Sequence, residues 1–159
     1  MIVVIGASND DILYFENVLT EKKEIMVLNQ YRAMQGTMFN QELIVVGGCY
    51  SSILTSVILT NILDHNYVDL VICVGKCIAV NKEIKTGDIV ISRRIIDANV
   101  DLSLFTNVVT GQIPSLHTDF DVQKDILEYL IKGMSRRSFV TLHLVNMLTS
   151  DIRCYPKAM

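Results

Sequence analysis

Two β-branched runs joined by one loop constrain the fold of this chain more than any other feature. Leu70–Val74 is an unbroken apolar run, and Ile89–Ile91 is a second one that follows the turn Lys85–Asp88. A continuous apolar run is typical of a strand buried on both faces by helices. The glycine and aspartate of the turn suit it, because glycine adopts positive φ and aspartate bonds nearby backbone. Ligands of open α/β sheets bind beyond the carboxyl ends of such strands, so we expect a site in this loop.

The first part of the chain alternates predicted strands and helices. Met1–Ile5 is a short apolar run, and the polar stretch Gly6–Asp11 predicts a loop and a helix N-cap. Apolar residues at helical spacing extend that helix to Glu21–Lys23. Further strands are predicted at Ile25–Leu28, Tyr31–Phe39 and Leu43–Val46, with a hairpin turn at Asn40-Gln41.

A second helix is predicted between Leu43–Val46 and Leu70–Val74. Ser51 or Ser52 caps it, and it ends near Asp64–Asn66. Its expected apolar side consists of Ile53, Leu54, Val57, Ile58 and Ile62. The order strand, helix, strand favours parallel pairing through a right-handed crossover.

The last part of the chain is less regular. Asp97–Pro114 reads as a long loop, and a loop of that length in a compact domain tends to be functional. An amphipathic helix begins near Val122 and is expected to end at Gly133. Phe139–Leu148 is the final strand candidate, and Asp151 closes it.

Composition and charge indicate one globular domain, residues 1–159. Half of the residues are apolar and only 19% are charged, which suits a packed core. The net charge of −3 is spread along the chain, so we expect no nucleic-acid partner. No apolar segment is long enough to span a bilayer and no basic region opens the chain, so we expect a cytoplasmic protein without a membrane partner. The four cysteines fit a reducing compartment, and their spacing predicts no metal site.

Several polar residues stand at the ends of predicted strands. Asp11, the loop Gly75–Val80 and Asp151 are candidates to line one crevice. Asp10 and Asp11 also have a simpler interpretation, in which they complement the dipole of the helix that they open. Two carboxylates in different surroundings can divide the roles of acid and base.

Short segments follow one another in a characteristic order along the chain: Ile5–Asp11, Gly47–Ser51, Val71–Gly75, Lys85–Ser92 and Gly111–Pro114. Lys85–Ser92, KTGDIVIS, is the most specific of them. In this order they resemble the nucleoside phosphorylase/nucleosidase superfamily, and most of all the 5′-methylthioadenosine/S-adenosylhomocysteine nucleosidases. The resemblance covers essentially the whole chain. It implies a three-layer α/β/α fold whose central layer is a mixed, largely parallel sheet. The C-terminal part of the family fold would be missing.

The resemblance also implies a reaction, the hydrolysis of the N-glycosidic bond of a purine nucleoside in methionine salvage. Asp11 matches the family carboxylate that activates water, and Asp151 matches the aspartate that helps to protonate the purine at N7. The positions matching substrate-binding segments are Ala7, Ser8, Cys49, Lys76, Cys77 and Ile78. The small-molecule nucleoside would be the substrate, no cofactor would be needed, and the chain would form a homodimer.

The chain departs from the family pattern in ways that leave other functions open. The family has a glutamate at the position of Asp11, and Lys76–Ala79 replaces a small Ser-Ala-Gly-Gly loop. The pair that holds the ribose hydroxyls is expected beyond Asp151, but the chain stops at Met159. One alternative is a catalytically degenerate purine-nucleoside-binding or structural homologue. Another is a phosphorolytic purine nucleoside phosphorylase, for which Lys76, Arg93 or Arg94 would have to offer the positive charge.

Overall fold

The structure, a computed structural model, describes residues 1–105, 107–109, 111, 112, 114, 120–134 and 141–151. The chain divides into two compact units, Met1–Cys77 and Ile78–Met159. No helix among these residues is long and apolar enough to cross a membrane.

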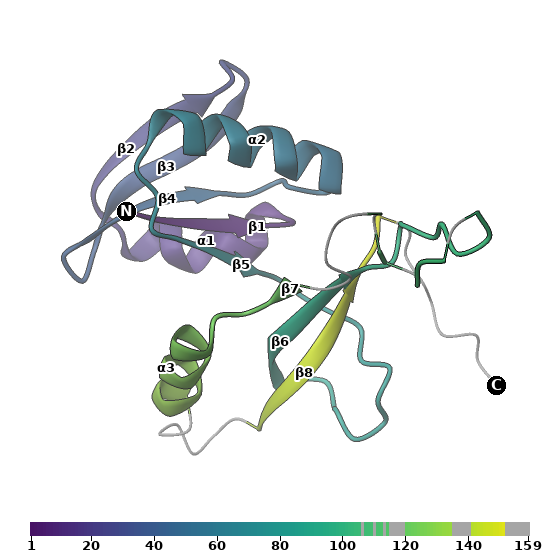
Figure 1. The fold of residues 1–159 in the computed structure, drawn as a ribbon. Helices are drawn as coiled ribbons and strands as arrows, with labels where there is room; N and C mark the ends of the chain where they lie inside the picture. The colour runs from purple at the N-terminus through teal and green to yellow at the C-terminus, as the bar shows by residue number, and fades with distance from the viewer. Residues whose placement is uncertain (106, 110, 113, 115–119, 135–140, 152–159) are drawn as a thin grey trace. The chain divides into compact units, whose positions relative to one another are not determined.

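The first unit is built on a five-stranded mixed sheet (Figure 1). Its strands are β1 (Ile2–Gly6), β2 (Thr20–Val27), β3 (Tyr31–Met38), β4 (Gln41–Val46) and β5 (Leu70–Val74), in the order β2-β3-β4-β1-β5. β1 is parallel to both of its neighbours, and Ile5 lies level with Val46 of β4 and Cys73 of β5. The carboxyl ends of these three strands therefore meet at one edge of the sheet.

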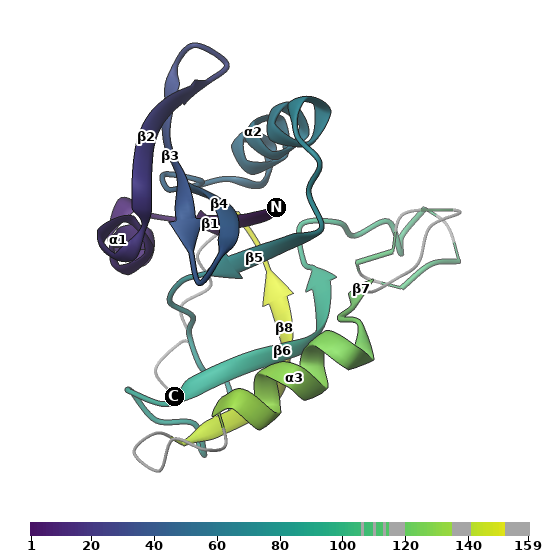
Figure 2. The same ribbon diagram turned by 90° about the vertical axis from the view of Figure 1, so that its left-hand side faces the viewer.

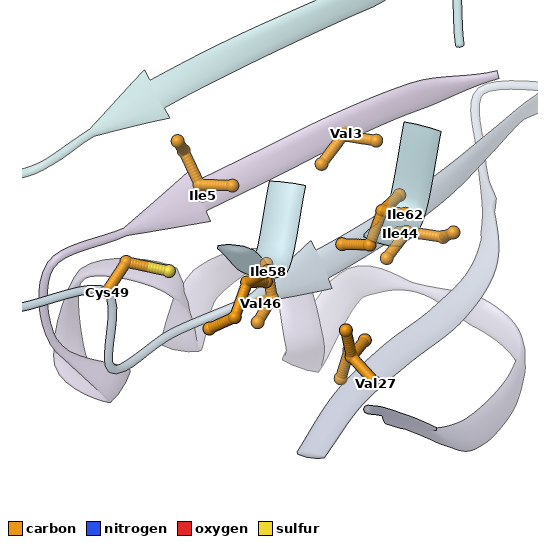
Figure 3. Packing of buried hydrophobic residues seen from close by; sticks show 9 residues of the cluster. Val3, Ile5, Val27, Ile44, Val46, Cys49, Ile58 and Ile62 are labelled. Atoms are coloured by element: carbon orange, nitrogen blue, oxygen red, sulfur yellow. The ribbon is translucent and has the colours of Figure 1, made fainter. Parts of the chain in front are cut away.

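Two helices cover opposite faces of this sheet: α1 (Asn9–Val18) and α2 (Ser52–His65). On one face, Val3 and Ile44 belong to a buried cluster with Ile58 of α2 (Figure 3). On the other face, Val4 belongs to a second cluster with Ile12 of α1. Because successive side chains of a strand point to opposite faces, this alternation produces three layers (Figure 2). The predicted mixed α/β fold is confirmed.

The boundary between α1 and β2 differs from the prediction. The helix ends at Val18, and Glu21–Lys23, which were expected to continue it, belong to β2. Leu19 at the helix end is buried, and Thr20 pairs with Thr37 of β3. Pairing with a distant strand thus outweighs the helical preference of the charged residues.

The hairpin between β3 and β4 turns one residue earlier than predicted. Phe39 and Asn40 adopt positive φ, 50° and 62°, whereas Gln41 already pairs with Met38. A two-residue turn with positive φ at both central positions matches the twist of the flanking strands.

β5 is less buried than its apolar sequence predicts. Among the described strands it lies at the edge of the sheet, with β1 as its partner. Val71 and Cys73 are exposed, while Ile72 packs against the cluster on the α1 face. The prediction of a strand buried on both faces is wrong for this unit, because Val71 and Cys73, which share one face, are exposed.

The described part of the second unit contains a three-stranded sheet and one helix. Its elements are β6 (Ile89–Asp97), β7 (Phe120–Asp121), α3 (Lys124–Met134) and β8 (Leu142–Thr149). β6 is central, antiparallel to β7 and parallel to β8. β6 runs further than its predicted core, and α3 continues through Gly133 to Met134 instead of ending there. The start of the strand predicted from residue 139, and Ile113, Cys154 and Met159, lie outside the described residues.

Candidate active site

The carboxylate of Asp11 is held at the sheet edge where β1, β4 and β5 end. Asp11 lies in the first turn of α1, and Ser8 is the N-cap of that helix. The Oδ2 atom of Asp11 accepts hydrogen bonds from the Ser8 backbone N–H (2.9 Å) and the Ser8 hydroxyl (2.8 Å). The side chain of Asp11 is only 6% exposed. This arrangement is the carboxylate half of a capping box, which satisfies an N–H at the helix start.

The other oxygen of this carboxylate faces a cation. Lys76 Nζ lies 3.7 Å from Asp11 Oδ1, and the Lys76 side chain is 83% exposed. The hydrogen bond from the Ser8 hydroxyl lowers the pKa of Asp11 most; burial opposes it, and the Ser8 backbone N–H and Lys76 lower it further. Asp11 is therefore held as a carboxylate, the form that can accept a proton from water.

Glycines at the strand ends let α1 approach closely. A Cβ on Gly47, which follows β4, would lie 2.6 Å from Asn9 Oδ1 and 2.9 Å from Asn9 Cα. The Cys49 N–H donates to the Gly6 carbonyl (3.1 Å), which ties the loop after β4 to the end of β1. The glycine segments noted in the sequence thus have a packing role beside the carboxylate.

Two thiols belong to the same region. Cys49 is buried and Cys73 on β5 is exposed, and among the described residues both are free thiols that form no disulfide. Burial raises the pKa of Cys73 and the charge of Asp11 raises it further, while burial and then Cys73 raise the pKa of Cys49. Both thiols therefore stay protonated near neutrality, and Cys49 packs in the buried cluster on the α2 face.

The other predicted substrate-binding residues in this region are more exposed. Ala7 and Cys77 are exposed and Ser8 is half-buried. Ser8 already uses its hydroxyl on Asp11, so it reaches a ligand only by changing that contact. The first unit thus places Ser8 and Lys76 each in contact with Asp11.

Asp151 and Ile78 belong to the second unit, where both are exposed. The Asp151 N–H and the Ser150 hydroxyl each donate to Asn99 Oδ1, at 3.0 Å. The Ala98 N–H also donates to the Thr149 carbonyl (2.8 Å). The chain after β6 therefore fixes the backbone of Asp151 at the end of β8.

The arginines considered for a phosphate site are engaged inside the second unit. Arg94 donates to both oxygens of Asp121, from Nε at 2.7 Å and from Nη2 at 3.2 Å. Arg93 Nε donates to Asn146 Oδ1 at 2.8 Å. The hydrogen bond from Arg94 is the main cause that lowers the pKa of Asp121.

No group of three or more His, Cys, Asp or Glu side chains suited to a metal ion occurs in the described part of the chain.

A profile of the Phosphorylase superfamily matches residues 1–154. The chain belongs to this superfamily. The 5′-methylthioadenosine/S-adenosylhomocysteine nucleosidase of Exiguobacterium sp. is 25% identical over 148 residues, which are 93% of this chain and 63% of the relative. That of Staphylococcus haemolyticus is 22% identical over 139 residues, 87% of this chain and 60% of the relative. The chain thus spans less than two thirds of the length of these curated relatives.

Solved structures show the same phosphorylase-superfamily fold. The nucleosidase from Neisseria meningitidis in complex with methylthio-immucillin-A matches with a TM-score of 0.87 at 20% identity, over 93% of this chain and 63% of that chain. A futalosine hydrolase mutant of Helicobacter pylori matches with a TM-score of 0.86 at 22% identity, over 98% and 69%. The predicted family and fold are confirmed.

Asn99 was missed by the sequence interpretation of this superfamily member. It follows β6 in the segment Asp97-Ala98-Asn99, where an Asx residue indicates a turn. The side chain of Asn99 reaches Ser150 and Asp151, about fifty residues later in the chain. A turn signal marks Asn99 as polar and local, but only the parallel pairing of β6 and β8 brings it to Asp151.

Proposed function

We propose that this chain hydrolyses the N-glycosidic bond of a purine nucleoside, with an adenosine thioether such as methylthioadenosine as substrate. Membership of the Phosphorylase superfamily and the likeness to nucleosidases over most of this chain support the proposal. In the reaction the C1′–N9 bond breaks and a C1′–O bond to water forms. One proton of the water goes to a base, and the leaving purine takes a proton from an acid. This is the chemistry of methionine salvage.

The observation that carries the proposal is the state of Asp11. A buried carboxylate with two hydrogen bonds to one oxygen is ionised and fixed, and its other oxygen is 3.7 Å from the nearest cation. That oxygen is the one available to a water molecule. A positioned base of this kind contributes about 10²–10⁴-fold to the rate.

We assign the acid role to Asp151, at the end of β8. Asn99 fixes its backbone, which supports a defined position for the carboxyl group. The substrate-binding role of Ala7, Ser8, Cys49, Lys76, Cys77 and Ile78 remains part of the proposal.

Phosphorolysis is less well supported than hydrolysis. Lys76 is paired with Asp11, and Arg94 is paired with Asp121 through two hydrogen bonds. A phosphate nucleophile needs cations and backbone donors whose charge is not already neutralised. Asp11 would moreover repel an anion placed at its open oxygen.

The test combines calorimetric titration with adenine and methylthioadenosine and an assay of adenine release. We expect the wild-type chain to bind both and to release adenine. Asp11→Asn should reduce turnover by about 10²–10⁴-fold, because the amide cannot take a proton from water. Asp151→Asn should abolish turnover, because the leaving purine then loses its proton donor. Asp10→Asn is the matched control, because Asp10 is an exposed neighbour in the same helical turn.

Other outcomes would decide between the alternatives. Binding of adenine without turnover would favour a catalytically degenerate binding homologue. Release of adenine only when phosphate is present would favour the phosphorolytic alternative. An Asp11→Asn variant with wild-type turnover would remove Asp11 from the mechanism and leave it only the capping role.

We also propose that the chain forms a homodimer through α2. Ile58 and Ile62 of this helix are buried against the sheet, but Ile53 and Val57 are 75% and 48% exposed. The predicted single apolar side is therefore divided, and part of it faces away from the sheet. An exposed apolar helix face of this kind is typical of a contact surface.

A further inference from the structure

We propose that Lys76 is the charge partner of Asp11, and that its ammonium stabilises the negative charge on Oδ1, the oxygen left open for the attacking water. The inference rests on the proposed hydrolysis for its catalytic meaning. It names a role for the residue that departs most from the small loop of the family pattern.

The two carboxylate oxygens of Asp11 have different partners. Both hydrogen bonds from Ser8 go to Oδ2, at 2.8 and 2.9 Å. The ion pair with Lys76 is made by Oδ1, at 3.7 Å. Since Oδ2 already accepts twice, a water molecule that gives up a proton to Asp11 has to approach Oδ1.

The contact between Lys76 Nζ and Asp11 Oδ1 is longer than a hydrogen bond. A charge-assisted N–H···O hydrogen bond is about 2.7–2.9 Å long, so 3.7 Å leaves the acceptor unsaturated. The ammonium stabilises the negative charge on Oδ1 without occupying its place as acceptor. A Cβ on Gly75 would lie 3.7 Å from Asp11 Oδ2, so the residue before Lys76 adds no bulk beside the carboxylate.

The side chains of Asp11 and Lys76 differ greatly in exposure. Asp11 is 6% exposed and fixed by the helix cap, whereas Lys76 is 83% exposed on a flexible stem. The carboxylate therefore keeps its position when Lys76 changes, and what Lys76 alters is the charge balance. Because the pair is neutral as a whole, it does not offer a net positive site to an anionic ligand.

Other titratable groups near Asp11 do not replace Lys76. Cys73 on β5 interacts electrostatically with Asp11, and Cys49 interacts with Cys73. Both are neutral thiols at the pH of the reaction. Asp10 on the same helix is exposed and carries the wrong sign. Lys76 is the cation that the ion pairs of the described residues place beside Asp11.

The experiment compares Lys76→Met, Lys76→Arg and the control Lys23→Met, which removes an exposed lysine of β2 in the same unit. The carboxyl ¹³C signal of Asp11 is followed against pH by NMR, and adenine release is measured across the same pH range. We expect Lys76→Met to move the Asp11 titration and the acid limb of the rate profile upward together, so the rate falls on the acid side. Lys76→Arg should restore both, and Lys23→Met should leave both unchanged.

The NMR titration does not need turnover, so it separates this inference from the proposed function. A wild-type chain that releases no adenine would overturn the hydrolysis and, with it, the catalytic role of Lys76. An Asp11 titration that is the same in Lys76→Met and wild type would overturn the inference even if hydrolysis is found. A titration that moves while the acid limb stays in place would also overturn the role of Lys76 as the charge partner of Asp11.

Discussion

Gly6 allows the first turn of α1 to lie against the end of β1. A Cβ at this position would lie 2.7 Å from Ile12 Cγ2 and 3.1 Å from the Ser8 carbonyl oxygen. Ile12 is only 2% exposed, so it has no free space into which to move. A side chain at position 6 would therefore displace this turn, which also orients Ser8 and Asp11.

Gly6→Ala should therefore lower the free energy of unfolding by about 1–3 kcal/mol, the usual cost of overpacking. The measurement is urea-induced unfolding followed by circular dichroism. Gly75→Ala is the matched control, because its Cβ would be no closer than 3.7 Å to Asp11. Equal stability of the Gly6→Ala variant and wild type would mean that the turn can open without cost.

The sequence predicted which residues belong to the site better than it predicted which of them are in contact. Ser8 and Asp11 were both named from the sequence as site residues, and the helix cap was expected in their segment. The ion pair of Asp11 with Lys76 was not predicted, since α1 and β5 are separated by about fifty residues and become neighbours through the pairing of β5 with β1. The assigned roles of Asp11 and Asp151 stay predictions.

At the scale of secondary-structure elements, the side chain of Asp88 connects the turn before β6 with β8. Asp88 Oδ2 accepts from the Lys85 N–H (2.8 Å) and lies 3.0 Å from His143 Nε2. The Lys85 backbone hydrogen bond is the main cause that lowers the pKa of Asp88, and the His143 contact lowers it further. The carboxylate form of Asp88 therefore stabilises the junction of turn and strand.

The lowered pKa of Asp88 determines how stability changes with pH. The contribution of Asp88 is present above its unfolded pKa, near 3.8, and is lost as the pH falls through the lower folded value. We expect Asp88→Asn to flatten the acid-side loss of stability. Hydrogen exchange of the β6 and β8 amides at several pH values measures it, with Asp64→Asn on α2 as the exposed control. An unchanged acid profile in Asp88→Asn would contradict this account.

Elements were predicted well where the local pattern is strong. β1, β3, β4 and α2 lie close to their expected bounds, and Ser51 caps α2 by accepting a hydrogen bond from the Leu54 N–H. The end of α1 and the burial of β5 were predicted wrongly. Both depend on which strand lies alongside, and local periodicity does not contain that information.

At the scale of the whole molecule, the proposed homodimer predicts a concentration-dependent mass. Sedimentation of the wild-type chain should give a dimer, and the double variant Ile53→Ser/Val57→Ser should give a monomer with unchanged circular dichroism. Met26→Ser is the control, because Met26 is 53% exposed but lies on β2. A stable, monodisperse wild-type monomer would contradict the homodimer.

The sequence by itself determined the family, the mixed α/β fold and the order of most elements. These follow from β-branched runs, helix caps and short glycine segments, which are local features and survive at about 20–25% identity to relatives. The prediction of one domain over residues 1–159 stays a prediction, and the chain divides into two compact units. Only the tertiary structure decided that Lys76 faces Asp11 and that Asn99 fixes Asp151. Such contacts depend on strand register and on which strands are neighbours, and these are set by packing across the whole sheet.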